Sequence, residues 1–123
     1  MTGSSVSGAS NVGGLIGNQN VLGTTVNCYT KTNVISEKDS ILNGNIGGLI
    51  GIASGSVIYC YASGNVKGKR CCGGLLGSLE GMATANNCYA TGDVISSDDL
   101  AGGLIEYLYD GSLANSCLSL IHI

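Results

Sequence analysis

Alternation of small or apolar residues with polar ones marks the most regular parts of this chain. In the segments at 60–66 and 88–94, every second residue is Cys, Ala, Gly or Val, and the residues between them are Tyr, Ser or Thr, and Asn or Asp. The segment at 28–34 is a looser copy of the same pattern. A period of two residues predicts β-strands with one face turned inward and the other outward.

A second pattern, two glycines followed by two adjacent aliphatic residues, precedes each of these segments. The copies read GGLIG from Gly13, GGLIG from Gly47, GGLLG from Gly73 and GGLIE from Gly102. Each copy predicts a short buried strand that is entered through a tight bend. The first glycine lies 15, 13, 15 and 15 residues before a cysteine in the four copies, at Cys28, Cys60, Cys88 and Cys117.

Together the two patterns define a repeat of about 30 residues, and the connections between units vary in length. From the valine that ends one unit to the next glycine pair, the separations are 13, 7 and 8 residues. Variable length with concentrated charge is typical of loops on one edge of a stack. The connections hold most of the charged residues, namely Glu37, Lys38, Asp39, Lys67, Lys69, Arg70, Asp98 and Asp99.

Glycine-rich units of this length favour an all-β fold, a β-solenoid (parallel β-helix-like) of about four stacked coils with one repeat per coil. Each coil would hydrogen-bond to its neighbours and bury only a slim core. A β-sandwich with similar strands is the alternative, but a sandwich has no reason to keep one glycine-to-cysteine spacing in successive units. We place the coils near 12–45, 46–71, 72–100 and 101–117.

The glycine core and the Cys-Tyr-Ala-Thr-Gly-Asp-Val segment resemble the GLUG motif, a short bacterial repeat. The resemblance extends from residue 12 to residue 117. It implies a large secreted or surface-attached bacterial protein, a group that includes adhesins, haemagglutinin-like proteins and some immunoglobulin A peptidases, in which the repeat is accessory. The resemblance carries no catalytic residues. The chain departs from the motif at Glu106, at Lys31 and Thr32, and after Cys117.

The two ends of the chain do not follow the repeat. Residues 1–11 resemble the end of a preceding repeat, and neither end supplies the polar cap that a solenoid needs. Residues 118–123, LSLIHI, form an anomalous tail that resembles a translated sequencing adapter. We interpret this tail as sequence that is not native, with a genuine terminus as the alternative. We therefore expect a fragment of a longer protein, with open strand edges that favour end-to-end association.

Composition and charge exclude several classes of function. A net charge of −3, with 11% charged residues, removes the attraction on which binding to nucleic acids depends. No apolar run reaches the roughly 18 residues needed to span a bilayer. The 21 glycines and the lack of Phe, Trp and Pro favour a thin, layered core. We thus expect no nucleic-acid partner and no membrane span.

Four of the six cysteines hold one position in successive units. Because equivalent positions stack, we expect them to form an inward column of buried thiols. Stacked neighbours about 4.8 Å apart also fall within the range of a disulfide, which stays open as the alternative. The column consists of Cys28, Cys60, Cys88 and Cys117.

The other two cysteines are adjacent in the sequence. Cys72 is expected to point inward, in one column with Val12, Ile46 and Ala101. Cys71 is expected to face a loop that contains Lys67, Lys69 and Arg70. Cations lower the pKa of a thiol, so Cys71 is the candidate reactive cysteine.

Two polar columns are expected on the outer face. Tyr29, Tyr61 and Tyr89 are candidate ligand-facing residues, because an exposed aromatic row contacts sugar rings or a partner surface. Packing of the rings along the sheet is the structural alternative. The neighbouring column is Asn33, Asn65 and Asp93, which we interpret as a turn-forming ladder in preference to a row of Ca²⁺ ligands.

We expect no enzyme activity, metal or cofactor. The chain has no paired Cys-x-x-Cys or His spacing for zinc, and its one histidine, His122, lies in the tail. Acids such as Glu37 and Asp98 lie in loops. Because clustered acids cleave glycosidic bonds in some β-solenoids, an accessory region of a secreted peptidase or carbohydrate-active enzyme is the alternative.

The function expected is that of a structural and interaction module in a secreted bacterial cell-surface protein, where it would serve adhesion or ligand presentation. Its partners would be neighbouring repeats of a longer chain and a host, matrix or glycan ligand outside the cell. The loops at 35–45, 67–71 and 95–100 are the segments most suited to ligand recognition, because length and charge vary there.

Overall fold

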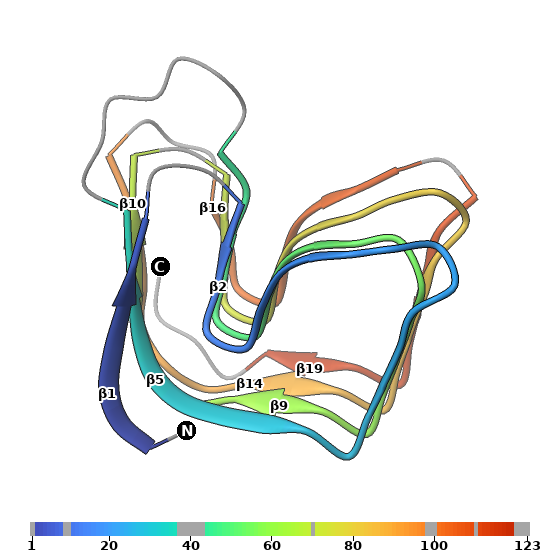
Figure 1. Cartoon of the computed structure of the whole chain (residues 1–123), viewed down its shortest axis with the longest axis horizontal. Coiled ribbons are helices and arrows are strands. Elements are labelled where there is room, and N and C mark those ends of the chain that lie inside the picture. Colours follow the sequence, from blue (N-terminus) through green and yellow to red (C-terminus); the bar gives the residue numbers. More distant parts are fainter. Residues whose placement is uncertain are drawn as a thin grey trace.

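The chain forms an all-β solenoid. The computed structural model describes residues 2–8, 11–36, 44–69, 71–97, 101–109 and 111–119. Within these ranges every regular element is a strand, and no helix forms. Strands of successive units pair in parallel, so the backbone winds through about three turns (Figure 1).

Three four-stranded sheets and one seven-stranded sheet form the sides of the solenoid. The first sheet contains β2 (Val12–Gly13), β6 (Ile46–Gly47), β11 (Cys72–Gly73) and β16 (Ala101–Gly102). The second contains β3 (Ile16–Gln19), β7 (Ile50–Ala53), β12 (Leu76–Leu79) and β17 (Ile105–Leu108).

The other two sheets complete each turn. The third contains β4 (Thr24–Val26), β8 (Ser56–Ile58), β13 (Thr84–Asn86) and β18 (Leu113–Asn115). The seven-stranded sheet contains β1 (Thr2–Ser7), β5 (Tyr29–Ile35), β9 (Tyr61–Ala62), β10 (Val66–Gly68), β14 (Tyr89–Ala90), β15 (Val94–Ser96) and β19 (Leu118–Ser119).

Equivalent residues of successive units lie beside one another in these sheets. The column predicted from the sequence is confirmed, since β2, β6, β11 and β16 pair in a single register. That register also places the first glycines of the four cores side by side. The members of the two columns are Val12, Ile46, Cys72 and Ala101, and Gly13, Gly47, Gly73 and Gly102.

The number of turns is smaller than the four coils expected. A complete turn contributes strands to all four sheets, and the chain completes three such turns between β2 and β15. The fourth passage runs from β16 to β19, and within the described residues no strand follows it beside β15. The solenoid therefore has about three turns.

The glycine pairs allow one wall of the solenoid to bend inward until it touches the opposite wall. A Cβ on Gly48 would lie 3.0 Å from the Cβ of Ala62 in β9, and it would also meet the carbonyl oxygen of Gly74. In the first turn, a Cβ on Gly14 would lie 3.3 Å from Oγ1 of Thr30. We call this contact of the Gly14 and Gly48 bends with Thr30 and Ala62 the pinch. Glycine is required there because the bend has no space for a side chain.

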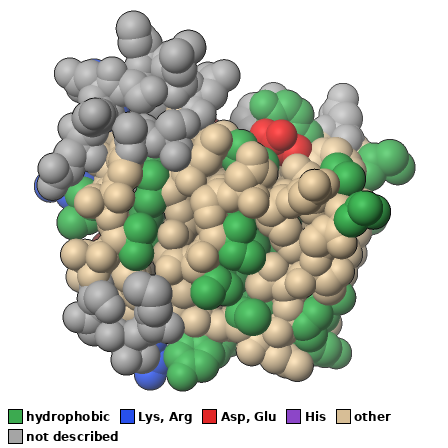
Figure 2. All heavy atoms as spheres, viewed as in Figure 1, with side chains coloured by type: hydrophobic (Ala, Val, Ile, Leu, Met, Phe, Trp, Pro, Cys, Tyr) green, Lys and Arg blue, Asp and Glu red, His purple; other side chains and the backbone are tan. Residues whose placement is uncertain are grey.

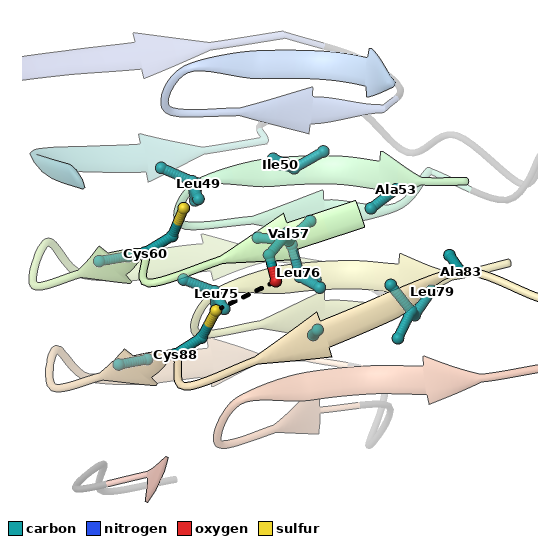
Figure 3. Close-up of a cluster of buried hydrophobic side chains, with 13 residues drawn as sticks. Leu49, Ile50, Ala53, Val57, Cys60, Leu75, Leu76, Leu79, Ala83 and Cys88 are labelled. Atoms are coloured by element: carbon teal, nitrogen blue, oxygen red, sulfur yellow. Dashed lines mark hydrogen bonds between the residues drawn. The ribbon is translucent and has the colours of Figure 1, made fainter. Parts of the chain in front are cut away.

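The bend separates two hydrophobic cores, one on each side of it. Figure 3 shows the larger one, in which leucines and cysteines of successive turns stack above one another. The larger core consists of Leu49, Ile50, Ala53, Val57, Cys60, Ala62, Leu75, Leu76, Leu79, Ala83, Ala85, Cys88 and Ala90. The smaller core consists of Val12, Val34, Ile46, Val66, Cys72 and Val94.

Strand β5 confirms the predicted alternation of inward and outward residues. Thr30, Thr32 and Val34 are fully buried, whereas the residues between them are exposed. Thr30 and Thr32 stand where the later units have alanine and glycine. The hydroxyl of Thr30 donates a 2.8 Å hydrogen bond to the carbonyl oxygen of Gly48, so the threonine is satisfied at the pinch.

The ends of the stack expose residues that are core residues in its middle. Leu15 is 44% exposed, whereas Leu49 and Leu75, at the same position in the next two turns, are 0% exposed. Figure 2 looks along the stack onto one end, where hydrophobic side chains lie among backbone and polar atoms. The difference arises because an end residue has a neighbouring turn on one side only.

Substitution of Gly48 by alanine tests the pinch. Gly48→Ala is expected to lower the free energy of unfolding by about 1–3 kcal/mol or more, because the new methyl group meets backbone atoms that no rotamer change can move. Chemical denaturation measures the loss. Ser97→Ala, at an exposed position, is the control and should change stability by less than about 0.5 kcal/mol. Equal stability of the two variants would contradict the pinch.

Candidate ligand-facing surface

The three predicted tyrosines form one continuous stack on the outer face of the seven-stranded sheet. Tyr29, Tyr61 and Tyr89 are Cα partners in the parallel register of β5, β9 and β14. The ring centroids of Tyr29 and Tyr61 lie 4.9 Å apart with an interplanar angle of 6°. Those of Tyr61 and Tyr89 lie 4.8 Å apart at 4°. The ring separation thus equals the spacing of the strands.

Stacking decides which parts of the tyrosines a ligand meets. Tyr29 and Tyr89 are 45% and 40% exposed, and Tyr61 between them is half-buried. Both faces of the Tyr61 ring are covered by its neighbours. A sugar ring therefore cannot lie flat on Tyr61, and a ligand would meet the ring edges and the phenol oxygens.

The asparagine column links successive turns through its side chains. Oδ1 of Asn33 accepts a 2.9 Å hydrogen bond from the backbone N–H of Asn65. Oδ1 of Asn65 accepts an equivalent 2.9 Å bond from the N–H of Asp93. The sequence predicted a ladder in which each side chain supports its own turn, but these bonds run to the next turn instead. The side-chain oxygens of Asn33 and Asn65 are thus already used as acceptors.

The inward cysteine column lies on the opposite side of the same wall. Sγ of Cys88 donates to the carbonyl oxygens of Asn86 at 3.2 Å and of Val57, in the preceding turn, at 3.6 Å (Figure 3). Cys60 makes the same pair of contacts one turn earlier. None of the six cysteines, all within the described ranges, is in a disulfide bond. The column therefore consists of thiols that bridge neighbouring turns.

Proximity within the cysteine column changes the acidity of two thiols. The neighbouring Cys88 thiol lowers the pKa of Cys60, because its polar S–H group stabilises a thiolate at Cys60. The proximity of Cys60, together with burial, raises the pKa of Cys88. Once Cys60 has lost its proton, loss of a second proton from Cys88 is strongly opposed.

Cys71, the predicted reactive cysteine, lies at a corner immediately before β11. Its backbone has a φ of 53°, close to the 51° of Asn11 at the same corner of the first turn. This left-handed conformation suits asparagine better than cysteine. The Cys71 residue is half-buried, and its predicted neighbour Arg70 lies outside the described residues. Its reactivity stays a prediction.

Cys72 differs from Cys71 because it points into the smaller core. The Cys72 residue is fully buried, as predicted. Burial raises the pKa of its thiol to about 11. A thiol with this pKa is protonated at neutral pH and reacts slowly.

The predicted ligand loops lie only in part within the described ranges. Residues 37–43, 70 and 98–100 are outside them. The acids on which an enzymatic alternative depends, Glu37 and Asp98, belong to these segments. Among the described residues, no cluster of three or more His, Cys, Asp or Glu side chains is arranged to hold a metal ion. The same residues contain no helix with the length and apolar character needed to cross a membrane.

Comparison with known proteins identifies the repeat. The family model of the GLUG motif matches residues 43–67, which include the second glycine core and the first Cys-Tyr-Ala segment. The chain carries the GLUG motif. The resemblance predicted from the glycine cores and cysteines is therefore confirmed.

One curated relative is halomucin from Haloquadratum walsbyi (strain DSM 16790 / HBSQ001). Over 129 residues it is 37% identical to the GLUG chain, and the match covers 94% of this chain and 1% of halomucin. The chain thus spans about one hundredth of the length of that relative. The organism is archaeal, so the expected bacterial source stays a prediction. No solved structure matches the chain.

Besides the asparagine bonds to the next turn, two features were not predicted from the sequence. The bonds of the cysteine thiols to carbonyl oxygens of the preceding turn have no signal in a residue pattern. The other feature is a shortened corner in the second turn, for which the signal was present: the spacing from glycine to cysteine is 13 residues there and 15 in the other units.

Thiol counting tests the cysteine assignments. In the folded protein we expect a small water-soluble thiol reagent to modify Cys71 before Cys60, Cys72 and Cys88, because those three residues are at most 1% exposed. Mass spectrometry identifies the modified residues. Denaturation without a reductant should then expose all 6 cysteines as thiols. A smaller number would reveal disulfides and overturn the thiol column.

Paired substitutions separate the ring of Tyr61 from its hydroxyl group. Tyr61→Ala removes two stacking contacts, each with a typical contribution of about 0.5–1.5 kcal/mol, so we expect stability to fall by about 1–3 kcal/mol. Tyr61→Phe keeps both contacts and should stay close to the unmodified protein. Chemical denaturation of the two variants measures the difference. An equal loss in both would show that the hydroxyl, rather than the stack, stabilises the turn.

Proposed function

We propose that this chain is a repeat segment of a secreted cell-surface protein, in which stacked turns present a regular polar face for adhesion or ligand presentation. The observation that carries the proposal is the register of the outer columns, because each turn places the same side chains at the same position. The GLUG motif and the similarity to halomucin support it. The ligand would be a host, matrix or glycan molecule outside the cell.

The proposed contact region, which we call the tyrosine–asparagine face, combines aromatic edges with hydrogen-bonding groups. Its members are Tyr29, Tyr61, Tyr89, Asn33, Asn65 and Asp93. Lys31 and Lys67 are exposed on the same outward side of β5 and β10. Phenol oxygens and amides supply both donors and acceptors, which suits a polar ligand such as a glycan. The neighbouring charged loops would add contacts at the edge of the face.

The architecture supports two further parts of the proposal. We infer one GLUG-type unit per turn, since the glycine cores and the tyrosines of successive units are aligned in the sheets. We also infer that the segment is a non-catalytic interaction module of a bacterial protein, and that its partners include neighbouring repeats of a longer chain. The open strand edges at the ends of the stack are suited to that contact.

Binding to immobilised glycans and matrix proteins tests the proposed function. We expect the fluorescently labelled chain to bind at least one glycan or matrix component, and Tyr61→Phe to weaken that binding at least threefold. Loss of a single hydrogen bond accounts for a change of this size, since such a bond typically contributes about 0.5–1.5 kcal/mol. Phenylalanine retains the ring stack, so a weaker signal reports on the hydroxyl and not on folding.

Tyr59→Phe is the matched control. Tyr59 is 59% exposed but precedes the cysteine at the corner, outside the tyrosine–asparagine face, so its hydroxyl should not contribute. Equal losses in Tyr59→Phe and Tyr61→Phe would argue against the face as the contact region. Absence of binding to every glycan and matrix component would overturn the adhesive function itself.

A further inference from the structure

A corner of the solenoid is shortened in the second turn. In the first turn the chain forms a tight turn from Asn20 to Gly23, where the N–H of Gly23 donates a 2.9 Å hydrogen bond to the carbonyl oxygen of Asn20. The third turn repeats this geometry between Glu80 and Ala83 at 3.1 Å. The second turn passes the same corner directly through Ser54, because its unit is two residues shorter. Figure 1 shows the shorter green corner between the longer blue and yellow ones.

The long corners of the first and third turns approach each other across the short one. A Cβ on Gly81 would lie 3.8 Å from Cγ1 of Val21 and 3.9 Å from Cβ of Ser54. Beside this corner lies an open hollow of about 500 Å³, between residues of the first turn and Ser54 of the second. Ligand sites in proteins commonly have volumes of about 300–1,000 Å³. We call this hollow the corner notch. It is lined by Asn18, Asn20, Val21 and Ser54.

The lining of the corner notch favours a neutral ligand rich in hydroxyl groups. Two side-chain amides and a hydroxyl supply donors and acceptors in one small area, and Val21 adds an apolar surface. None of the lining residues is charged, so an anion or a cation would find no opposite charge in the lining. Glu80, on the neighbouring corner, accepts a 3.0 Å hydrogen bond from Ser78. Sugars combine hydroxyl groups with apolar C–H faces, which matches this lining.

We propose that the corner notch is a carbohydrate-binding site that accepts one or two neutral sugar units. The site is separate from the tyrosine–asparagine face, because the sheet of β4, β8, β13 and β18 lies between them (Figure 1). The inference therefore goes beyond the proposed function and does not require the tyrosine stack. Because the notch is open and the asparagines that line it are exposed, we expect weak binding.

Restoration of the missing corner gives a direct test. Insertion of a Gly-Met pair between Ser54 and Gly55 gives the second unit the two corner residues that the third unit has at Gly81 and Met82. The inserted residues directly follow Ser54, so they change the corner beside the lining. We expect ¹⁵N-labelled chain titrated with maltose, cellobiose or chitobiose to show amide shifts at residues 18–21 and 54, and the insertion to weaken that binding at least tenfold.

A second variant keeps the test independent of the insertion. The double substitution Asn20→Ala with Ser54→Ala removes two polar groups of the lining and should weaken binding at least fivefold. Ser97→Ala, far from the corner in the sequence and outside the lining, is the control and should bind as the unmodified chain does. Circular dichroism establishes that each variant used in the comparison is folded.

The possible outcomes separate this inference from the proposed function. Amide shifts confined to the tyrosine–asparagine face would support adhesion through that face and overturn the notch. Notch shifts that persist unchanged in the double variant would also overturn it, as would the lack of any shift with all three disaccharides. Notch shifts that disappear in the variants but persist in Tyr61→Phe would establish a separate sugar site.

Discussion

The contact between the glycine bends and the opposite wall is the constraint on which the rest of the solenoid depends. At Gly48 the backbone comes so close to Ala62 that a single methyl group has no space. The wall can fold inward only where the facing residues leave space, which accounts for the glycines at the bends and for the slim cores on either side. A chain with 21 glycines and no Phe or Trp is thus suited to this fold because it has few bulky side chains to bury.

Close approach of the walls also determines where functional groups are found. Buried Leu, Val and Cys side chains occupy the interior of the described turns, whereas the tyrosine and asparagine columns lie on the outside. Tyr61 and Asn65 belong to the segment that faces the pinch, and the alternation of the strand directs them outward while Ala62 and Val66 point inward. The same backbone therefore supports the core and holds the outer columns in register.

Much of the fold could be predicted from the sequence, because it depends on a local period that repeats. The column that contains Cys72 and Ile46, and the outward direction of Tyr61, follow from alternation and from alignment of the units. The pinch could not be predicted in the same way, since it joins Gly48 to Ala62 across the interior and no periodicity records which walls meet. The hydrogen bond from the next turn to the side chain of Asn65 was also missed. An asparagine in the sequence looks the same whether its side chain accepts a hydrogen bond from its own turn or from the next one. The shortened corner was visible as a spacing of 13 in place of 15, but only the structure shows the open hollow that Asn18, Asn20 and Val21 form with Ser54.

The regular stack of Tyr29, Tyr61 and Tyr89 has a consequence for longer arrays. Each added turn that has a tyrosine at this position would extend the column by one ring at the spacing of 4.8–4.9 Å observed here, whereas the fourth passage of this chain has Leu118 there. A ligand that itself repeats, such as a polysaccharide, would therefore meet several weak contacts held on one rigid support. Rigid linkage makes each contact after the first effectively intramolecular, so total binding strength rises steeply with valency. The number of repeats then becomes the quantity that sets the avidity.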